Sequence, residues 1–525
     1  MKQFAASTTR GSTLVTVLVL GSICIMLVVV LIGRVVIQER SLRMSLDNAV
    51  AIQIAETGLE KLRWHLAHNP QGYDGPQNVS INGDGQYIFN EDYRDPQTNE
   101  VVGEIKYVVE PEEFCGLASH ATVTVTGTSF IEGRDYTLQQ VHTQDTAANY
   151  AYIYNDDVQA GSDRLIRGRY HSNSSIEMNG QNDSVVSSSQ TNGVFGNPVH
   201  PDARQDLWQD EVGTIDFNAL ALDLETIYDS ADTYNGDPVE TDTAGDDSPT
   251  GDRLFILEES CYSYNWPFWW GPYTNETCNG AEAFEVALID DGDNVPSIEV
   301  WELDGLPVIS RTNDDDAREK YCSNFASSDA DHDVEPIATC TDYRSNYLGE
   351  FELDNSCPVA FFQGDVFLHG TTDSKLLIAS GDLSGTDTSD VYLFNSINYG
   401  EDDGTDGLTV VSEGDIKIGY SVPDDMEVRG IFIAQSGRYG RDNYDGNWSF
   451  DRDVFQERDF LQTVGSIISN EGGGTKWTTS GGSFVSGFRD RENYYDRSLS
   501  RRPPPLTPTV SENYTYLEWR DEEVR

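Results

Sequence analysis

Aromatic residues gathered between two cysteines are the part of this sequence best suited to contact a ligand. Trp266, Trp269, Trp270 and Tyr273 stand within one short segment. Exposed indole and phenol rings stack on sugar rings and anchor protein partners. Rings of this kind also fill small cores inside disulfide loops. Two interpretations follow: a candidate ligand-stacking surface for glycans or for proteins of a host or partner cell, and a small local core.

Three aspartates at alternate positions, Asp329, Asp331 and Asp333, could supply oxygen ligands to calcium. The segment has no glycine at the sixth position and no glutamate at the twelfth, so it is not an EF-hand loop. Solvated acidic turns are the alternative interpretation. We therefore expect no cofactor, with calcium at these aspartates as the one metal that the sequence suggests.

Six of the seven cysteines lie outside the apolar N-terminal segment that contains Cys24. No pair has the C-x-x-C spacing and the chain has only eight histidines, which argues against structural zinc. Disulfides formed in an oxidising compartment are the better interpretation. The sequence does not choose among their pairings. The candidate disulfide cysteines are Cys115, Cys261, Cys278, Cys322, Cys340 and Cys357.

No catalytic motif is present: the sequence lacks G-x-S-x-G, H-E-x-x-H, a phosphate-binding loop and a dinucleotide fingerprint. Carboxylates are so abundant, 89 acidic against 34 basic residues, that pairs of them identify no active site. The formal net charge of -55 repels phosphate backbones. We expect a protein that is not an enzyme and does not bind nucleic acid.

The elements that must position these residues begin with a long helix. An almost unbroken apolar run from Leu14 to Ile32 is just long enough to cross a bilayer. Beyond Arg34, apolar residues at steps of three or four predict that the helix continues to His68 with one apolar face. The predicted face comprises Leu42, Leu46, Ala49, Ile52, Ala55, Leu59, Leu62 and Leu66.

Three segments of this helix, 10–15 (RGSTLV), 38–40 (QER) and 55–60 (AETGLE), resemble the N-terminus of PilX-like type IV pilus assembly proteins, which are minor pilins. The resemblance implies prepilin-peptidase cleavage after Gly11 and a mature N-terminus at Ser12. Thr16 stands where major pilins have a glutamate, and an uncleaved signal anchor is the alternative. Segments 494–496, 503–505 and 518–520 resemble the β-helical second half of such proteins.

After the helix, the sequence alternates in the manner of β-strands. Runs such as 105–109 and 121–127 predict an antiparallel sheet packed on the helix. A Gly-Asp-apolar unit then recurs at Gly364, Gly381 and Gly414, at intervals of 17 and 33 residues. A period near 17 fits one coil of a β-solenoid, and a β-sandwich with many Gly-Asp turns is the alternative.

The predicted fold is α+β: a long N-terminal helix, a small antiparallel β head, then a mainly β region, a right-handed β-helix with an inserted disulfide-bearing subdomain. The predicted domains are a leader-like segment (1–11), the transmembrane and amphipathic helix (12–70), a pilin-like β head (71–147), the first solenoid part (148–200), an inserted Cys/Trp-rich subdomain (201–356), the second solenoid part (357–500) and a Pro-rich tail (501–525).

These features predict a non-enzymatic, minor pilin-like subunit of a type IV pilus or related filament, acting in pilus assembly or adhesion. The helix would anchor it in the cell membrane before assembly and contact other pilin-type subunits. The remainder would be extracellular or periplasmic, or on the pilus surface. One alternative is a membrane-anchored surface or envelope protein outside any filament. Another is an extracellular carbohydrate-active β-helix enzyme.

Overall fold

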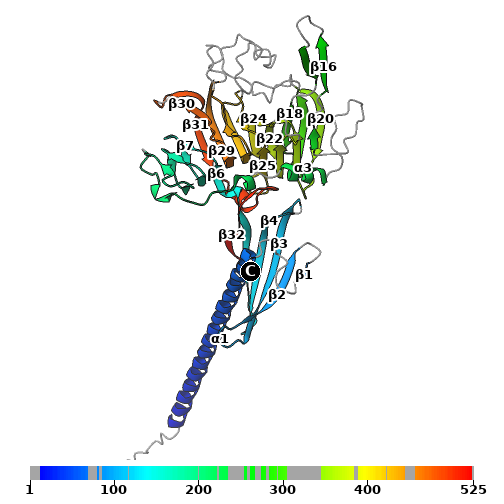
Figure 1. Ribbon diagram of the computed structural model, residues 1–525. Helices are drawn as coiled ribbons and strands as arrows, with labels where there is room; N and C mark the ends of the chain where they lie inside the picture. The colour runs from blue at the N-terminus through cyan, green and yellow to red at the C-terminus, as the bar shows by residue number, and fades with distance from the viewer. Residues whose placement is uncertain are drawn as a thin grey trace, which may run out of the picture. The chain divides into compact units, whose positions relative to one another are not determined.

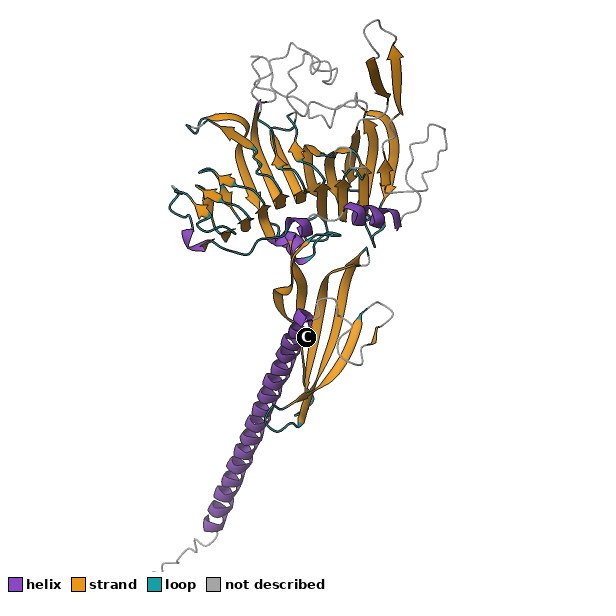
Figure 2. Ribbon diagram, viewed as in Figure 1, coloured by secondary structure: helices purple, strands orange, loops and turns teal. Residues whose placement is uncertain are grey.

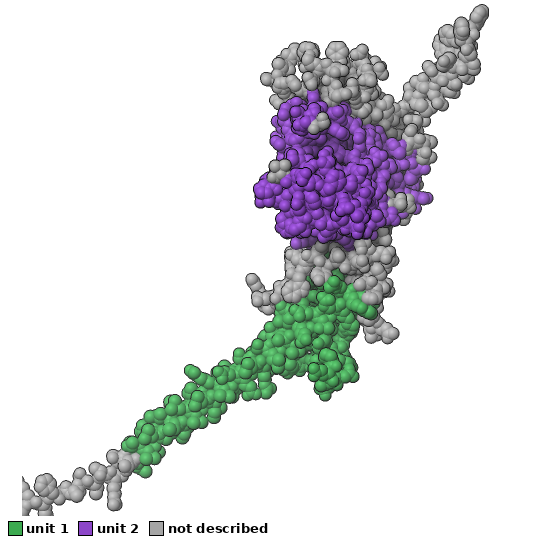
Figure 3. Space-filling model, turned by 60° about the vertical axis from the view of Figure 1, so that its left-hand side comes forward, with its two compact units in different colours: residues 1–110, 122–142, 516–525 green, residues 111–121, 143–515 purple. Residues whose placement is uncertain are grey.

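The computed structural model describes sixteen segments of the chain: 12–68, 80–81, 86–115, 117–198, 200–220, 224–233, 254–256, 260–266, 273–279, 283–292, 294–303, 344–383, 388–420, 422–443, 456–479 and 481–522. These fall into two compact units. Unit 1 comprises residues 1–110, 122–142 and 516–525, and unit 2 comprises residues 111–121 and 143–515 (Figure 3).

Unit 1 begins with a single helix, α1 (Ser12–His68), which runs without interruption, as the sequence predicts (Figure 1). Neither glycine of its first half, Gly21 or Gly33, breaks it, since leucine, valine and isoleucine fill the neighbouring turns. Every residue from Leu14 to Leu46 is exposed in the isolated chain. The second half of α1 lies along a β-sheet (Figures 1 and 2).

That sheet has six strands in the order β1-β2-β3-β4-β5-β32. β1 pairs antiparallel with β2, and β2 with β3. The strands are β1 (Ser80–Ile81), β2 (Tyr87–Arg94), β3 (Val101–Phe114), β4 (Leu117–Ser129), β5 (Asp135–Thr146) and β32 (Thr509–Glu522). The last strand of the chain therefore returns to the sheet formed by the first five. It occupies most of the segment that the sequence analysis describes as a Pro-rich tail.

The face of α1 that is buried differs from the predicted face. Ala55, Leu59 and Leu62 are buried as predicted, but Leu42 and Leu46 are exposed. The buried stripe instead continues towards the N-terminus through small or polar residues. The sheet ends there, so the apolar residues before position 47 have no surface in unit 1 to pack on. The buried residues are Asp47, Ala51, Ile54, Ala55, Gly58, Leu59 and Leu62.

Unit 2 is built from short strands that pair in parallel (Figure 1). The longest ladder runs in the order β15-β21-β23-β25-β27-β29-β6-β9-β12-β14. Its strands are β15 (Leu254–Ile256), β21 (Val359–Gln363), β23 (Lys375–Ser380), β25 (Gly407–Ser412), β27 (Asp425–Ala434), β29 (Glu457–Ser469), β6 (Tyr150–Tyr154), β9 (Arg169–Ser172), β12 (Val186–Ser188) and β14 (Trp208–Gln209).

A second ladder runs β18-β22-β24-β26-β28, also in parallel, and β29 pairs in parallel with β31. Shorter parallel ladders join β7 to β10 to β13 and β8 to β11. These strands are β18 (Ala283–Ile289), β22 (Asp365–Thr372), β24 (Val391–Tyr399), β26 (Ile416–Ile418), β28 (Tyr439–Gly440), β31 (Phe484–Tyr494), β7 (Val158–Ala160), β10 (Ile176–Met178), β13 (Val194–Phe195), β8 (Leu165–Ile166) and β11 (Gln181–Asn182).

The remaining elements of unit 2 lie at its ends or on its faces. β18 and β20 pair antiparallel with β19, β30 pairs antiparallel with β31, and β16 and β17 form a hairpin. They are β16 (Ser260–Trp266), β17 (Tyr273–Asn279), β19 (Ser297–Leu303), β20 (Arg344–Glu352), β30 (Lys476–Thr478), α2 (Phe217–Leu220), α3 (Leu224–Thr233), α4 (Arg497–Arg501), η2 (Ala147–Asn149) and η3 (Gln205–Leu207). The segment 201–356, predicted to be an insertion, contributes β14, β15 and β18 to the ladders.

The repeat length predicted from the Gly-Asp-apolar units is wrong for the segment in which it was found. The Asp365 carboxylate accepts the Asp390 backbone N–H, and the Asp390 carboxylate accepts the Asp415 backbone N–H, at 2.8 and 2.7 Å. These three aspartates form a column with a spacing of 25 residues, to which Asp382 does not belong. A spacing of 18 residues does occur earlier, where Ile176 pairs with Val158 and with Val194.

The strands in the middle of the long ladder are buried on both faces. Along β23, Leu376 and Ile378 point into the main core between the ladders, whereas Leu377 and Ala379 point into a second core. Ile227 of α3 covers this second core, which explains why such strands read as continuous apolar runs. The fold class is therefore confirmed at its coarser level: a long apolar helix followed by a mostly β region with a disulfide.

Candidate membrane and assembly helix

The first half of α1 is apolar on all sides and has no protein surface over it. Leu14, Met26 and Ile37 keep 68, 70 and 69% of their exposure. The helix contains a window with a mean hydropathy of 3.1, none of it buried. By length and composition, α1 can cross a membrane. Cys24, a free cysteine, is exposed on this half.

The second half of α1 is fixed to the sheet by small residues and a few polar contacts. Glycines on β3 and β4 let the helix backbone come close, because a Cβ at Gly127 would lie 2.5 Å from the Ala51 carbonyl oxygen. Asp47, only 1% exposed, accepts the Glu132 backbone N–H at 3.3 Å. At the other end, Lys61 forms an ion pair with Glu91.

Glu91 also accepts a hydrogen bond from the Tyr107 hydroxyl at 2.6 Å. Burial raises the pKa of Tyr107 far above its usual range, with Glu91 adding to the effect. The phenol therefore stays a neutral donor at any physiological pH. On β5, burial lowers the pKa of His142 to about 4, and the positive charge of Arg63 contributes. His142 is thus a neutral residue of the unit 1 core, bonded to Gln140 at 3.0 Å.

One disulfide lies in unit 2, between Cys115 and Cys357, residues 242 positions apart in the sequence. Its sulfur atoms are 2.05 Å apart. The Cys115 backbone N–H also donates to the Ser356 carbonyl at 2.8 Å. Both cysteines were candidates from the sequence, which left their pairing open. Cys261 and Cys278 face each other in the register of the β16–β17 hairpin, and Cys322 and Cys340 lie outside the described residues.

The other candidate residues from the sequence fall largely outside the described part of the chain. Gly11 is outside it, and α1 begins at Ser12. Trp266 and Tyr273 are paired across the β16–β17 hairpin, whereas Trp269 and Trp270 are not described. Asp329, Asp331 and Asp333 are also outside the described residues. Among the residues that are described, no group of three or more histidine, cysteine, aspartate or glutamate side chains is arranged to hold a metal ion.

The sequence analysis missed the residues that dock α1 on the sheet. Asp47 and Ala51 are absent from the predicted face, and Gly103 and Gly127 received no role. A signal was present, since a glycine inside an alternating strand often marks a close backbone approach. Gly127 ends the run 121–127 and lies against Ala51 and Ala55, two small residues one turn apart.

Comparisons with known proteins give limited information. No protein-family model matches the chain, and no curated protein matches it. Among solved structures, the chain is similar to the competence-associated pilin ComZ from Thermus thermophilus, with 13% identity over 90% of this chain and 97% of that one. The TM-score is 0.26, and a value this low does not define a common fold. The finer resemblance to PilX-like proteins has no support from these comparisons.

Proposed function

We propose that this chain is a non-enzymatic, pilin-like subunit that is anchored in a membrane by α1 and then assembled into a type IV pilus or related filament. The observation that carries the proposal is the division of α1 into two halves. One half is uncovered and wholly apolar, and the other is docked on a sheet. This division matches the PilX-like sequence resemblance at positions 10–15, 38–40 and 55–60.

The exposed apolar half needs two environments in succession. An uncovered surface of leucine, valine and isoleucine is unfavourable in water, at roughly 25 cal/mol per Å². A bilayer covers it before assembly, and the helices of neighbouring subunits cover it in a filament core. Leu42 and Leu46 are 71 and 57% exposed beyond the segment that a bilayer needs. Their exposure favours helix-to-helix packing over a simple anchor.

We further propose that the ladders of unit 2 form a β-solenoid that presents the outer surface of the subunit. Three features support this: the long parallel ladder, the aspartate column at positions 365, 390 and 415, and cores on both sides of the ladder. The solenoid would carry the adhesive or assembly role, with surface glycans or partner-cell proteins as its ligands.

Mass spectrometry of the mature N-terminus tests the proposal in the native host. A pilin-type subunit is expected to begin at Ser12, after removal of residues 1–11. A Gly11→Leu variant should keep residues 1–11, and a Gly33→Leu variant on the same helix should be processed normally. A wild-type chain that still carries Met1 would support the plain membrane-anchored surface protein instead.

A further inference from the structure

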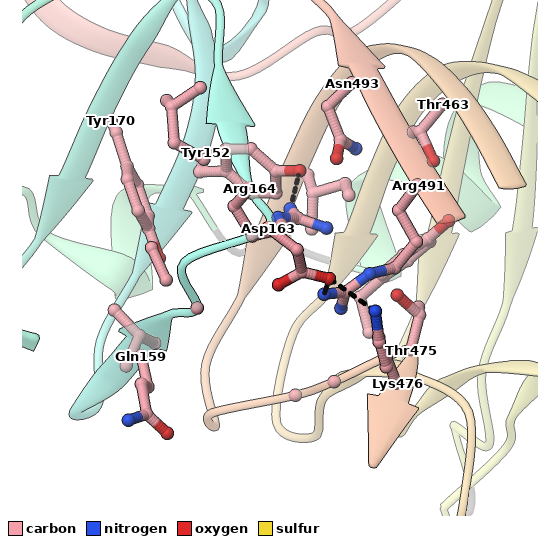
Figure 4. Close-up of a pocket in the computed structure, with 18 of the residues that line it drawn as sticks. Tyr152, Gln159, Asp163, Arg164, Tyr170, Thr463, Thr475, Lys476, Arg491 and Asn493 are labelled. Atoms are coloured by element: carbon pink, nitrogen blue, oxygen red, sulfur yellow. Dashed lines mark hydrogen bonds and ion pairs between the residues drawn. The ribbon is translucent and has the colours of Figure 1, made fainter. Parts of the chain in front are cut away.

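A cavity of about 150 Å³ opens in unit 2 where β29 lies beside β6 (Figure 4). These two strands join the run of the ladder from β15 to β29 with the run from β6 to β14. The walls therefore combine residues from distant parts of the sequence, such as Tyr152, Arg164, Lys476 and Arg491. A cavity of about 150 Å³ is large enough for one six-membered ring.

The cavity carries an excess of positive charge in a chain whose formal net charge is -55. Arg164, Lys476 and Arg491 line it, against a single lining carboxylate, Asp163. Asp163 accepts hydrogen bonds from Lys476 Nζ at 2.6 Å and from Arg491 Nη2 at 3.0 Å (Figure 4). One carboxylate thus serves two cations, and Arg164 is left with a phenol.

The two guanidinium groups are poorly compensated. Arg164 Nη2 donates to the Tyr152 hydroxyl at 2.5 Å, a neutral acceptor. The Arg491 side chain is 11% exposed, and its buried Nε has no hydrogen-bond partner among the described residues. Burial lowers the pKa of Arg491 to about 10, and the charge of Arg164 adds to this shift. Two buried like charges with unused donors are the arrangement that a bidentate anion relieves.

One wall of the cavity is aromatic. Tyr152, Tyr154 and Tyr170 are at most 6% exposed, and their ring centroids lie 5.0 to 5.9 Å apart. Burial raises the pKa of all three phenols, so they remain neutral. Gln159 and Asn493 also line the cavity. A ligand that fits has a flat apolar face, hydroxyl groups and one anionic group, which excludes inorganic phosphate as the best match.

We propose that this cavity binds a single carboxylate-bearing sugar residue, a hexuronic acid of an acidic polysaccharide. The carboxylate would be held by Arg164 and Arg491, and the sugar ring would lie against the tyrosine wall. The proposal goes beyond the proposed function and does not depend on it, since the same cavity would bind in a chain that never enters a filament.

Isothermal titration of the full-length protein in detergent micelles tests this with sodium glucuronate as the probe. Saturable binding is expected, and glucose, which has the same ring without the carboxylate, should bind at least about tenfold more weakly. Equal affinity for the two sugars, no binding of glucuronate, or tighter binding of inorganic phosphate would overturn the proposal. These comparisons use only the wild-type chain, so they stand whatever a substitution does to folding.

A pair of variants on one strand tests the assignment to the cavity. Arg491→Gln should weaken glucuronate binding about tenfold or more, because it removes a charged donor. Arg489→Gln is the matched control, since Arg489 is also on β31 but is 50% exposed and pairs with Glu457. Equal losses in both variants, or no loss in a folded Arg491→Gln chain, would show that glucuronate binds elsewhere.

Discussion

Individual glycines determine how closely α1 approaches the sheet of unit 1. A Cβ at Gly127 would lie 2.5 Å from both the Ala51 carbonyl oxygen and the Ala55 nitrogen, which are backbone atoms. A Cβ at Gly58 would lie 2.6 Å from a Val125 methyl group, which can move. Position 127 is therefore the stricter of the two.

The first prediction concerns Gly127→Ala. The new methyl group must push α1 away from β4, and overpacking of this kind costs about 1–3 kcal/mol. Urea unfolding followed by helix circular dichroism should show a lower midpoint. Gly33→Ala is the control, because nothing lies within 4 Å of that position. Equal midpoints for wild type and Gly127→Ala would contradict the close helix–sheet contact.

The second prediction concerns acid stability. The pKa of His142 is about 4 in the folded chain, against an ordinary value of 6.5, because burial disfavours the cation. The unfolded chain therefore binds the proton more tightly, and the stability of unit 1 should fall as pH drops from about 6.5 towards 4, by up to about 3 kcal/mol. His142→Leu should flatten this slope. An unchanged slope in the variant would rule out His142 as its cause.

Asp365 has the opposite sign and serves as an internal comparison. Burial raises its pKa to about 6, so its protonated form is favoured in the folded state. Its contribution is present at pH below about 4 and is lost as pH rises through 6. Asp365 lies in unit 2, so unfolding must be followed by a probe specific to unit 1 when the His142 slope is measured.

At the scale of elements, the Cys115–Cys357 bond fixes the segment just after β3 to the segment just before β21. Cys357 is fully buried in the core that α3 covers. Closing a loop of 242 residues restricts the unfolded chain strongly. Such a cross-link is expected to contribute about 2–5 kcal/mol.

The third prediction follows from this bond. The double variant Cys115→Ser, Cys357→Ser should lower the melting temperature of unit 2, and a reducing agent should have the same effect on the wild-type chain but not on the variant. Differential scanning calorimetry with and without the reductant measures both. A melting temperature that is unchanged in the variant would mean that the bond does not constrain the unfolded chain.

Some elements could be predicted from the sequence, and others could not. The length of α1 follows from its local pattern alone. Its buried face does not, because the sheet that covers it begins only opposite Asp47. The 25-residue spacing of Asp365, Asp390 and Asp415 escaped because Gly381-Asp382 repeats the motif without occupying the column. The residues of the cavity, such as Arg164 and Arg491, are joined only by the pairing of β29 with β6, which no local pattern contains.

At the scale of the whole molecule, two properties must be reconciled: a formal net charge of -55 and an uncovered apolar helix. Chains with this charge repel one another in water, whereas their apolar helices attract. A membrane followed by a filament core accommodates both, because the helices are gathered inside while the acidic surface stays in water. This is the fourth prediction, and it concerns where the chain is found in the cell.

Quantifying the chain in native cells, separately in membranes and in filaments sheared from the surface, tests this most directly. We predict two pools: a membrane pool of precursor and a sheared pool in which the chain sediments together with other pilin-type subunits. A Val29→Lys variant, which charges the apolar half of α1, should be lost from the sheared pool. A wild-type chain found only in membranes, with none in the sheared material, would contradict the account.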